Sequence, residues 1–135
     1  MALPTLSGEF KVAHEPTLTF TSNGKARLKL SVVANDRKKD PNGEWVDGDP
    51  WWGDIIVWGK AAENLAEVVT KGAFVVVANA RCEQYKFESK DGGGQRTGYQ
   101  YVADAIGLSF RRISVQSAAA HAAQELGAQE VEAPF

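Results

Sequence analysis

Three of the four tryptophans in this chain lie within one ten-residue segment, residues 51–60, which reads WWGDIIVWGK. The rest of the segment is typical of a β-strand, in which successive side chains point to opposite faces. Trp52 and Trp58 therefore share one face with Ile56, and Trp51 lies on the other. Because Trp51 and Trp52 cannot both point into one core, at least one of them faces away from it and needs a partner.

Two roles fit a strand face with a large indole at each end. It can be a stacking platform for nucleic-acid bases, since stacking on an aromatic ring contributes roughly 1 to 3 kcal/mol per base whatever the base. It can equally be part of a barrel core, since aromatic side chains bury large areas and dominate cores. The strand alone leaves both roles open.

The bulk composition fits one globular domain with a tail. The chain has 135 residues, of which 44% are hydrophobic and 24% charged, and no apolar run approaches the roughly 20 residues of a membrane span. The N-terminal residues do not resemble an export signal, and the single cysteine, Cys82, excludes an intrachain disulfide. We therefore expect a cytoplasmic protein.

The net charge of −2 does not exclude a nucleic-acid partner, because its distribution is uneven. All lysines and arginines lie at or before Arg112, whereas Glu125, Glu130 and Glu132 follow it. A nearly neutral body with an acidic tail can hold a local cationic groove, since steering follows the local field.

Alternating apolar and polar residues predict a first strand over residues 5–12 and then a hairpin of residues 17–21 and 25–34 with its turn at 22–24, which supplies the second barrel strand. The polar stretch 35–50 is rich in turn residues, and it predicts a long hairpin arm that leads into the tryptophan strand.

After Gly59 the apolar period becomes helical, with Ala62, Leu65, Ala66 and Val69 on one face and a stop at Gly72. The apolar run 73–80 then predicts a buried strand that continues through 81–87. Residues 89–98 predict a flexible basic loop, residues 99–106 the last barrel strand, and residues 108–115 a candidate further strand. Five strands with one short helix between the third and the fourth predict an all-β protein, the five-stranded OB-fold barrel.

Several motifs, in order, resemble those of the bacterial and phage single-stranded DNA-binding proteins over residues 5–112. They include GEFKV at 8–12, EPTLTFTSNG at 15–24, the segment from Trp52 to Ala66, and TKG at 70–72. The resemblance implies single-stranded DNA binding without sequence preference, in replication, recombination and repair. It also implies a homo-oligomer, with a tetramer favoured and a dimer as the alternative.

Carried over by position, Trp52 and Trp58 match the family's stacking aromatics, and Tyr85 or Phe87 matches another. Tyr85 and Phe87 share a face under strict alternation, and packing within a hairpin is the alternative role for both. Many family members carry an aromatic where this chain has Asn35, so Trp45 in the arm is a candidate replacement. The cations expected to flank these rings are Arg37, Lys38, Lys39, Lys86, Lys90 and Arg96.

The resemblance also bears on the C-terminal part. We expect an OB-fold domain over residues 1–116 and, over residues 117–135, an Ala-rich linker with a short acidic tip. The tip resembles the one with which family members recruit replication, recombination and repair proteins, and its candidate residues are Glu130, Glu132, Pro134 and Phe135. The strand expected at 108–115 resembles an extra C-terminal strand of actinobacterial members.

Catalysis has little support in the sequence. His14 and His121 are far apart, and no H-E-x-x-H, G-x-S-x-G or paired-cysteine motif occurs. We expect no enzyme, no cofactor and no metal site. The competing class is an OB-fold adaptor whose aromatic side chains anchor a protein partner, since a fold does not fix a function.

Overall fold

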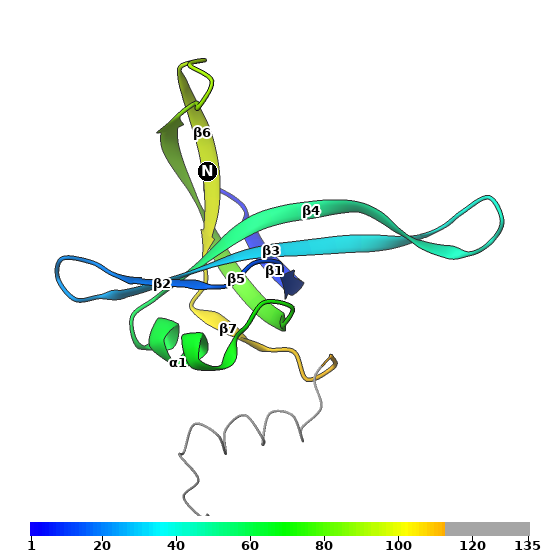
Figure 1. Ribbon diagram of the computed structural model, residues 1–135, viewed down its shortest axis with the longest axis horizontal. Helices are drawn as coiled ribbons and strands as arrows, with labels where there is room; N and C mark the ends of the chain where they lie inside the picture. Colours follow the sequence, from blue (N-terminus) through cyan, green and yellow to red (C-terminus); the bar gives the residue numbers. More distant parts are fainter. Residues whose placement is uncertain (113–135) are drawn as a thin grey trace, which may run out of the picture.

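The computed structural model describes residues 1–112, which form seven β-strands and one α-helix (Figure 1). In chain order they are β1 (Thr5–Val12), β2 (Thr17–Phe20), β3 (Ala26–Lys39), β4 (Trp45–Trp58), α1 (Lys60–Val68), β5 (Phe74–Glu88), β6 (Gln95–Val102) and β7 (Ala105–Leu108). No helix in this part of the chain is long and apolar enough to cross a membrane.

Five of the strands close into a ring in the order β1-β3-β4-β6-β5, because β1 pairs with both β3 and β5. The β4–β6 pair is parallel and the other neighbours in the ring are antiparallel. The short strands β2 and β7 extend the sheet by pairing with β3 and β5. This is the OB-fold barrel, which confirms the predicted fold class.

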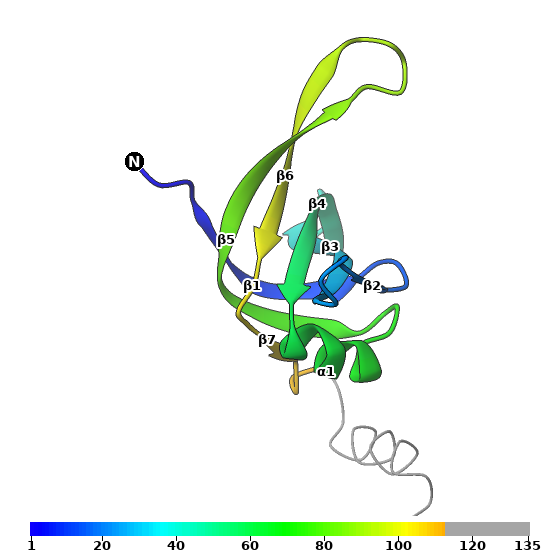
Figure 2. The same ribbon diagram turned by 90° about the vertical axis from the view of Figure 1, so that its left-hand side faces the viewer.

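The predicted alternation in β3 is confirmed, and it supplies one wall of the core. Ala26, Leu28, Leu30 and Val32 are all buried, and they meet buried residues of β1, β4 and β5 in one apolar cluster. Helix α1 lies at the end of β4, as Figure 2 shows, and adds Ala62 and Leu65 to this cluster. The helical period predicted after Gly59 is therefore also confirmed.

The arm predicted between β3 and β4 exists, but its sides are regular strands (Figure 1). Pairing continues past the barrel to Arg37 with Asp47 and to Lys39 with Trp45. Only the tip is a turn, in which the Asp40 carboxylate accepts hydrogen bonds from two backbone N–H groups. The polar, glycine-containing stretch thus forms strand because cross-strand pairing and this capped turn outweigh its composition.

Three further sequence predictions need correction. The loop expected at 89–98 is shorter, since β5 runs to Glu88 and β6 begins at Gln95. The strand expected at 99–106 is divided, because the chain leaves β6 after Val102 and β7 pairs instead with the first half of β5. Residues 109–112 contain no strand, and the rest of the strand expected at 108–115 lies outside the described residues. The predicted linker and tip, residues 117–135, also lie outside the described residues.

The run 73–80 is a strand but is not buried throughout. Val75 and Val77 point into the core, whereas Val76 between them is 44% exposed. The apolar cluster covers only one face of β5, so every second side chain points outward.

Candidate nucleic-acid interface

The register of the sheet gathers four aromatic residues on its outer face. Ile55 and Val57 point into the core, so Trp52 and Trp58 point outward. Ile56 is the parallel partner of Val102 on β6, and Val102 is the partner of Arg81 on β5. Directly paired residues share a face, and on β5 that face continues at alternate positions from Arg81 through Glu83. The four outward residues, here called the aromatic face, are Trp52, Trp58, Tyr85 and Phe87.

Polar side chains cross this face between its two aromatic ends. Arg27, paired with Trp58 across β3 and β4, donates from Nη2 to Gln100 Oε1 at 3.5 Å. Gln100 Nε2 in turn donates to Glu83 Oε2 at 3.4 Å. These bonds link β3, β6 and β5, and they give the face hydrogen-bonding groups beside its rings.

Trp52 is the most open indole of the aromatic face, at 56% exposure. It lies six residues from Trp58 along β4, which corresponds to about 20 Å of strand. The imidazole of His14 lies nearly parallel to it, with ring centroids 6.3 Å apart and an interplanar angle of 19°. An exposed indole with an approximately parallel ring beside it has the geometry to accept a further planar group.

Trp51 points to the opposite face, as the alternation predicts. Its ring contacts Phe10 and Tyr101, with centroids 5.5 and 6.1 Å away. It lies across Gly53, where an added Cβ would come within 2.4 Å of Trp51 Cη2. Trp51 therefore has aromatic neighbours within the barrel, whereas Trp52 faces outward.

Tyr85 and Phe87 form the second pair of rings, on the β5–β6 hairpin. Their centroids are 5.9 Å apart and their planes are tilted by 42°. Both are partly exposed, and the predicted shared face is confirmed. Because the planes differ, the two rings do not present one flat surface.

Trp58 differs from the other members of the face because cations already lie over its ring. Lys25 Nζ is 5.2 Å and Arg27 Cζ 5.8 Å from the ring centroid. Sequence reasoning did not include these two residues among the site cations. For Arg27 a signal existed, since the core positions Ala26 and Leu28 place it on the outward side of β3.

The cations predicted from sequence occupy several different places. Arg96 is paired with Phe87 and lies 3.8 Å from Asp91 in an ion pair. Lys86 points to the face of β5 opposite the aromatic residues, and Lys90 lies in the turn at the hairpin end. Of the predicted cations on this hairpin, the register therefore brings only Arg96 beside the aromatic face.

The arm carries a separate group of the predicted residues. Lys39 Nζ lies 5.3 Å from the centroid of the exposed Trp45 ring, and Arg37 forms an ion pair with Asp47 at 3.7 Å. Lys38 alternates to the other face of the arm. Trp45 is seven residues from Trp52, or about 23 Å of extended strand. The arm is thus a second aromatic and basic cluster, distinct from the aromatic face.

Residues 109–112 are attached to β1 through Glu9. Its carboxylate accepts a hydrogen bond from the Ser109 hydroxyl and another from Arg112 Nε at 3.2 Å, and it lies 3.7 Å from Arg111 Nη2. The hydrogen bond from Ser109, aided by both arginines, lowers the pKa of Glu9 below its ordinary value. This cluster is structural and lies outside the aromatic face.

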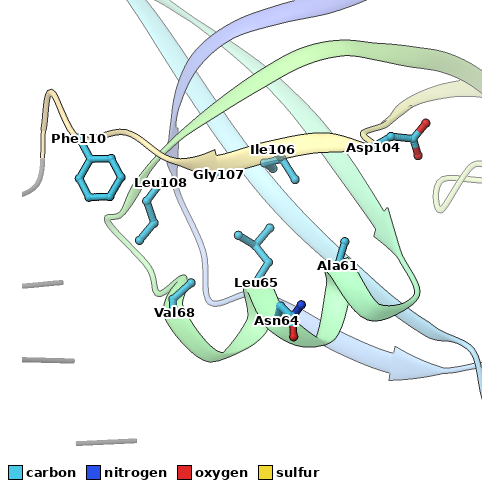
Figure 3. Close-up of a pocket in the computed structure, with 9 residues that line it drawn as sticks. All are labelled: Ala61, Asn64, Leu65, Val68, Asp104, Ile106, Gly107, Leu108 and Phe110. Atoms are coloured by element: carbon cyan, nitrogen blue, oxygen red, sulfur yellow. The ribbon is translucent and has the colours of Figure 1, made fainter. Parts of the chain in front are cut away.

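A hollow of about 390 Å³ lies between α1 and β7 (Figure 3). Its walls are largely aliphatic, and Phe110 stands at its edge. It is lined by Ala61, Asn64, Leu65, Val68, Asp104, Ile106, Gly107, Leu108 and Phe110. None of these is cationic, so the hollow does not suit a phosphate backbone. Within residues 1–112 no group of three His, Cys, Asp or Glu side chains is placed to hold a metal ion.

The fold and this face define an OB-fold protein with an exposed aromatic and basic sheet surface, a class that binds oligonucleotides and oligosaccharides. Residues 5–109 match the Single-strand binding protein family, and the chain belongs to that family. Membership of a family of binding proteins agrees with the expectation that the chain is not an enzyme.

Among similar curated proteins, the single-stranded DNA-binding protein of Mycobacterium leprae is 40% identical over 98 residues, covering 72% of this chain and 57% of the relative. "Single-stranded DNA-binding protein 2" of Streptomyces coelicolor is 37% identical over 98 residues, covering 72% and 48%. The chain thus spans about half the length of these relatives. The match to actinobacterial proteins confirms the resemblance seen in the motifs.

Solved structures agree with the fold. A small single-stranded DNA-binding protein from Streptomyces coelicolor is 26% identical with a TM-score of 0.65, and the match covers 84% of this chain and all of that one. A deletion mutant of the Thermus aquaticus protein matches at a TM-score of 0.59 and 24% identity, over 80% of this chain and 52% of that one. The second likeness supports the fold alone.

Proposed function

We propose that this protein binds single-stranded DNA without sequence preference. The observation that carries the proposal is the aromatic face, on which the register of β4, β6 and β5 gathers Trp52, Trp58, Tyr85 and Phe87 beside cationic side chains. The names of the relatives that share the fold, and membership of the Single-strand binding protein family, support the same conclusion.

The chemistry of this face explains the lack of sequence preference. Rings stack on any base, and cations follow a phosphate backbone that is the same at every nucleotide. Neither kind of contact reads the edge of a base. Trp52, Tyr85 and Phe87 are the exposed rings of the face and are the proposed stacking residues. Arg96 beside Phe87 is a proposed backbone contact.

The arm extends the proposed interface. Trp45, with Lys39 over its ring and Arg37 on the same side, repeats the combination of ring and cation at about 23 Å from Trp52. We assign Arg37, Lys38 and Lys39 to backbone contacts and Trp45 to a further stacking position. Lys86 and Lys90 are proposed to contact the DNA backbone where the DNA strand reaches the reverse side of the β5–β6 hairpin.

Binding of labelled homopolymers tests the proposal. Fluorescence anisotropy with oligo(dT), oligo(dA) and a mixed sequence of equal length should give similar affinities. Duplex of the same length should compete poorly, because its bases are stacked on each other and unavailable to rings. An OB-fold adaptor for a protein partner, the alternative raised by the sequence, would bind none of these oligonucleotides with micromolar protein.

We further propose that the protein acts in replication, recombination and repair as a homo-oligomer, and recruits partners through residues 130–135. Family membership supports this wider role. Deleting Pro134 and Phe135 should leave oligo(dT) affinity nearly unchanged and abolish capture of replication and repair proteins. Equal recovery of the same proteins by both forms would remove the recruiting role and leave DNA binding standing.

A further inference from the structure

Trp58 lies where the family resemblance places a stacking ring, yet two cationic side chains already contact its indole. Its side chain is only partly exposed, and both Lys25 and Arg27 lie over the indole. A base that stacks on a ring face covered by one of these cations would have to displace that cation. Cations over the face of a tryptophan are attracted by the ring quadrupole, so displacing them has a cost.

The two cations come from different parts of one hairpin. Lys25 precedes β3 in the turn that follows β2, and Arg27 is the direct cross-strand partner of Trp58. Arg27 is held on a second side by its hydrogen bond to Gln100. The guanidinium of Arg27 is therefore held by the Trp58 ring and by Gln100. Within residues 1–112, the described contact of the Lys25 ammonium is with the Trp58 ring.

Neither cation is neutralised by a carboxylate in the described part of the chain, in contrast to Lys29, Arg37 and Arg96. Lys29 pairs with Asp54, Arg37 with Asp47 and Arg96 with Asp91. Lys25 and Arg27 form no ion pair within residues 1–112. An ammonium has three N–H donors and a guanidinium five, and only one of these eight has a described side-chain acceptor.

We propose that Trp58 is a positioning residue rather than a stacking platform. Its ring holds Lys25 and Arg27 in place as a phosphate-binding pair at this end of the aromatic face. Two like charges beside one ring repel each other, and an anion between them removes that repulsion, so a backbone phosphate is the group that suits the pair. This inference rests on the proposed binding of single-stranded DNA and assigns a role within it.

The salt dependence of oligo(dT) binding separates this role from stacking. Each phosphate neutralised on a single strand contributes about 0.7 to the log–log slope of affinity against salt, so two contacts contribute about 1.4. In the Lys25→Gln, Arg27→Gln double variant, the slope of log affinity against log salt concentration should fall by about that amount. Trp58→Leu should lose most of the same slope, because the cations are no longer held. Trp58→Phe keeps a ring and should restore it.

Two comparisons complete the test. Trp52→Leu should lower affinity at every salt concentration without changing the slope, since it removes a ring and no charge contact. Adding Trp58→Leu to the Lys25→Gln, Arg27→Gln variant should have little further effect on affinity. Circular dichroism establishes that each variant is folded, and the double cation variant, which removes no core residue, gives the slope even if Trp58→Leu does not fold.

The outcomes are distinct. An unchanged slope in the double cation variant overturns the phosphate contact. A Trp58→Leu variant that keeps the wild-type slope but loses affinity, additively with the cation changes, overturns positioning and makes Trp58 a stacking residue. Absence of oligo(dT) binding by the wild-type protein would remove the proposed function, and this inference with it.

Discussion

Tyr85 lies across its cross-strand partner Gly98, so closely that a Cβ added at Gly98 would come within 2.5 Å of Tyr85 Cζ. A glycine on β6 thus makes the space in which the Tyr85 ring lies against the sheet. Phe87, the next outward residue on β5, faces Arg96 and is tilted by 42° from Tyr85. Of the two rings, only Tyr85 depends on a glycine for its orientation.

Gly98→Ala should therefore weaken oligo(dT) binding by displacing Tyr85. The loss should not exceed that of Tyr85→Ala, for which removal of one stacked ring costs roughly 1 to 3 kcal/mol. Gly107→Ala on β7 is the matched control, because an added Cβ there meets nothing within 4 Å. Wild-type affinity in Gly98→Ala together with weak binding by Tyr85→Ala would show that the ring tolerates the methyl group.

Trp52→Ala should cost about 1 to 3 kcal/mol of oligo(dT) binding, the contribution of one base stacked on a ring. The melting temperature should change little, since Trp52 is 56% exposed and belongs to no core cluster. Phe110→Ala removes an even more exposed ring, beside α1 and away from the aromatic face, and should leave binding unchanged. Loss of folding in Trp52→Ala would instead make Trp52 a structural residue.

Replacing Arg37, Lys38 and Lys39 together with glutamine should reduce the salt slope of oligo(dT) binding by roughly 2 if all three contact phosphates. The ion pair between Arg37 and Asp47 is exposed, and such pairs contribute little, so a phosphate can replace Asp47. Arg111→Gln, in the segment attached to Glu9 and outside the aromatic face, is the control for a general loss of charge. An unchanged slope would assign the arm to subunit or partner contacts.

Glu9→Gln should make the stability of the protein less dependent on pH in the acid range. The pKa of Glu9 is lowered in the fold, first by the Ser109 hydrogen bond and then by Arg112 and Arg111. Its stabilising contribution is therefore complete above the ordinary value of 4.5 and is lost as the pH falls through the lowered value. Melting temperatures of wild type and variant should differ at neutral pH and converge in acid. Glu15→Gln, which breaks no ion pair within residues 1–112, should show no such convergence.

Local patterns predicted much of the fold. The alternation of Ala26, Leu28, Leu30 and Val32 identified the core face of β3, and the helical spacing of Ala62 and Leu65 identified α1. The same alternation separated Trp51 from Trp52. These predictions hold because burial on one face repeats with the period of the element itself.

Predictions that needed cross-strand information were less accurate. The hairpin arm was predicted correctly, but its turn-favouring residues did not show how far its strands extend, and Arg37 and Lys39 are in strand through pairing with Asp47 and Trp45. Val76 looked buried because the apolar run does not show which faces of β5 are covered. The alternation of Ala26 and Leu28 places Arg27 on the outward side of β3, but its contact with Trp58 follows from the register of β3 against β4, which no local pattern contains.

The most direct test of the central claim is the tryptophan emission of the protein during titration with oligo(dT). If bases stack on the aromatic face, emission of the wild type should be strongly quenched, and Trp52→Phe should show less quenching because the most open indole of that face is missing. Duplex of equal length should cause little change at the same concentration. Emission that stays unchanged throughout the oligo(dT) titration, with no mobility shift at micromolar protein, would contradict the proposal that this face binds single-stranded DNA.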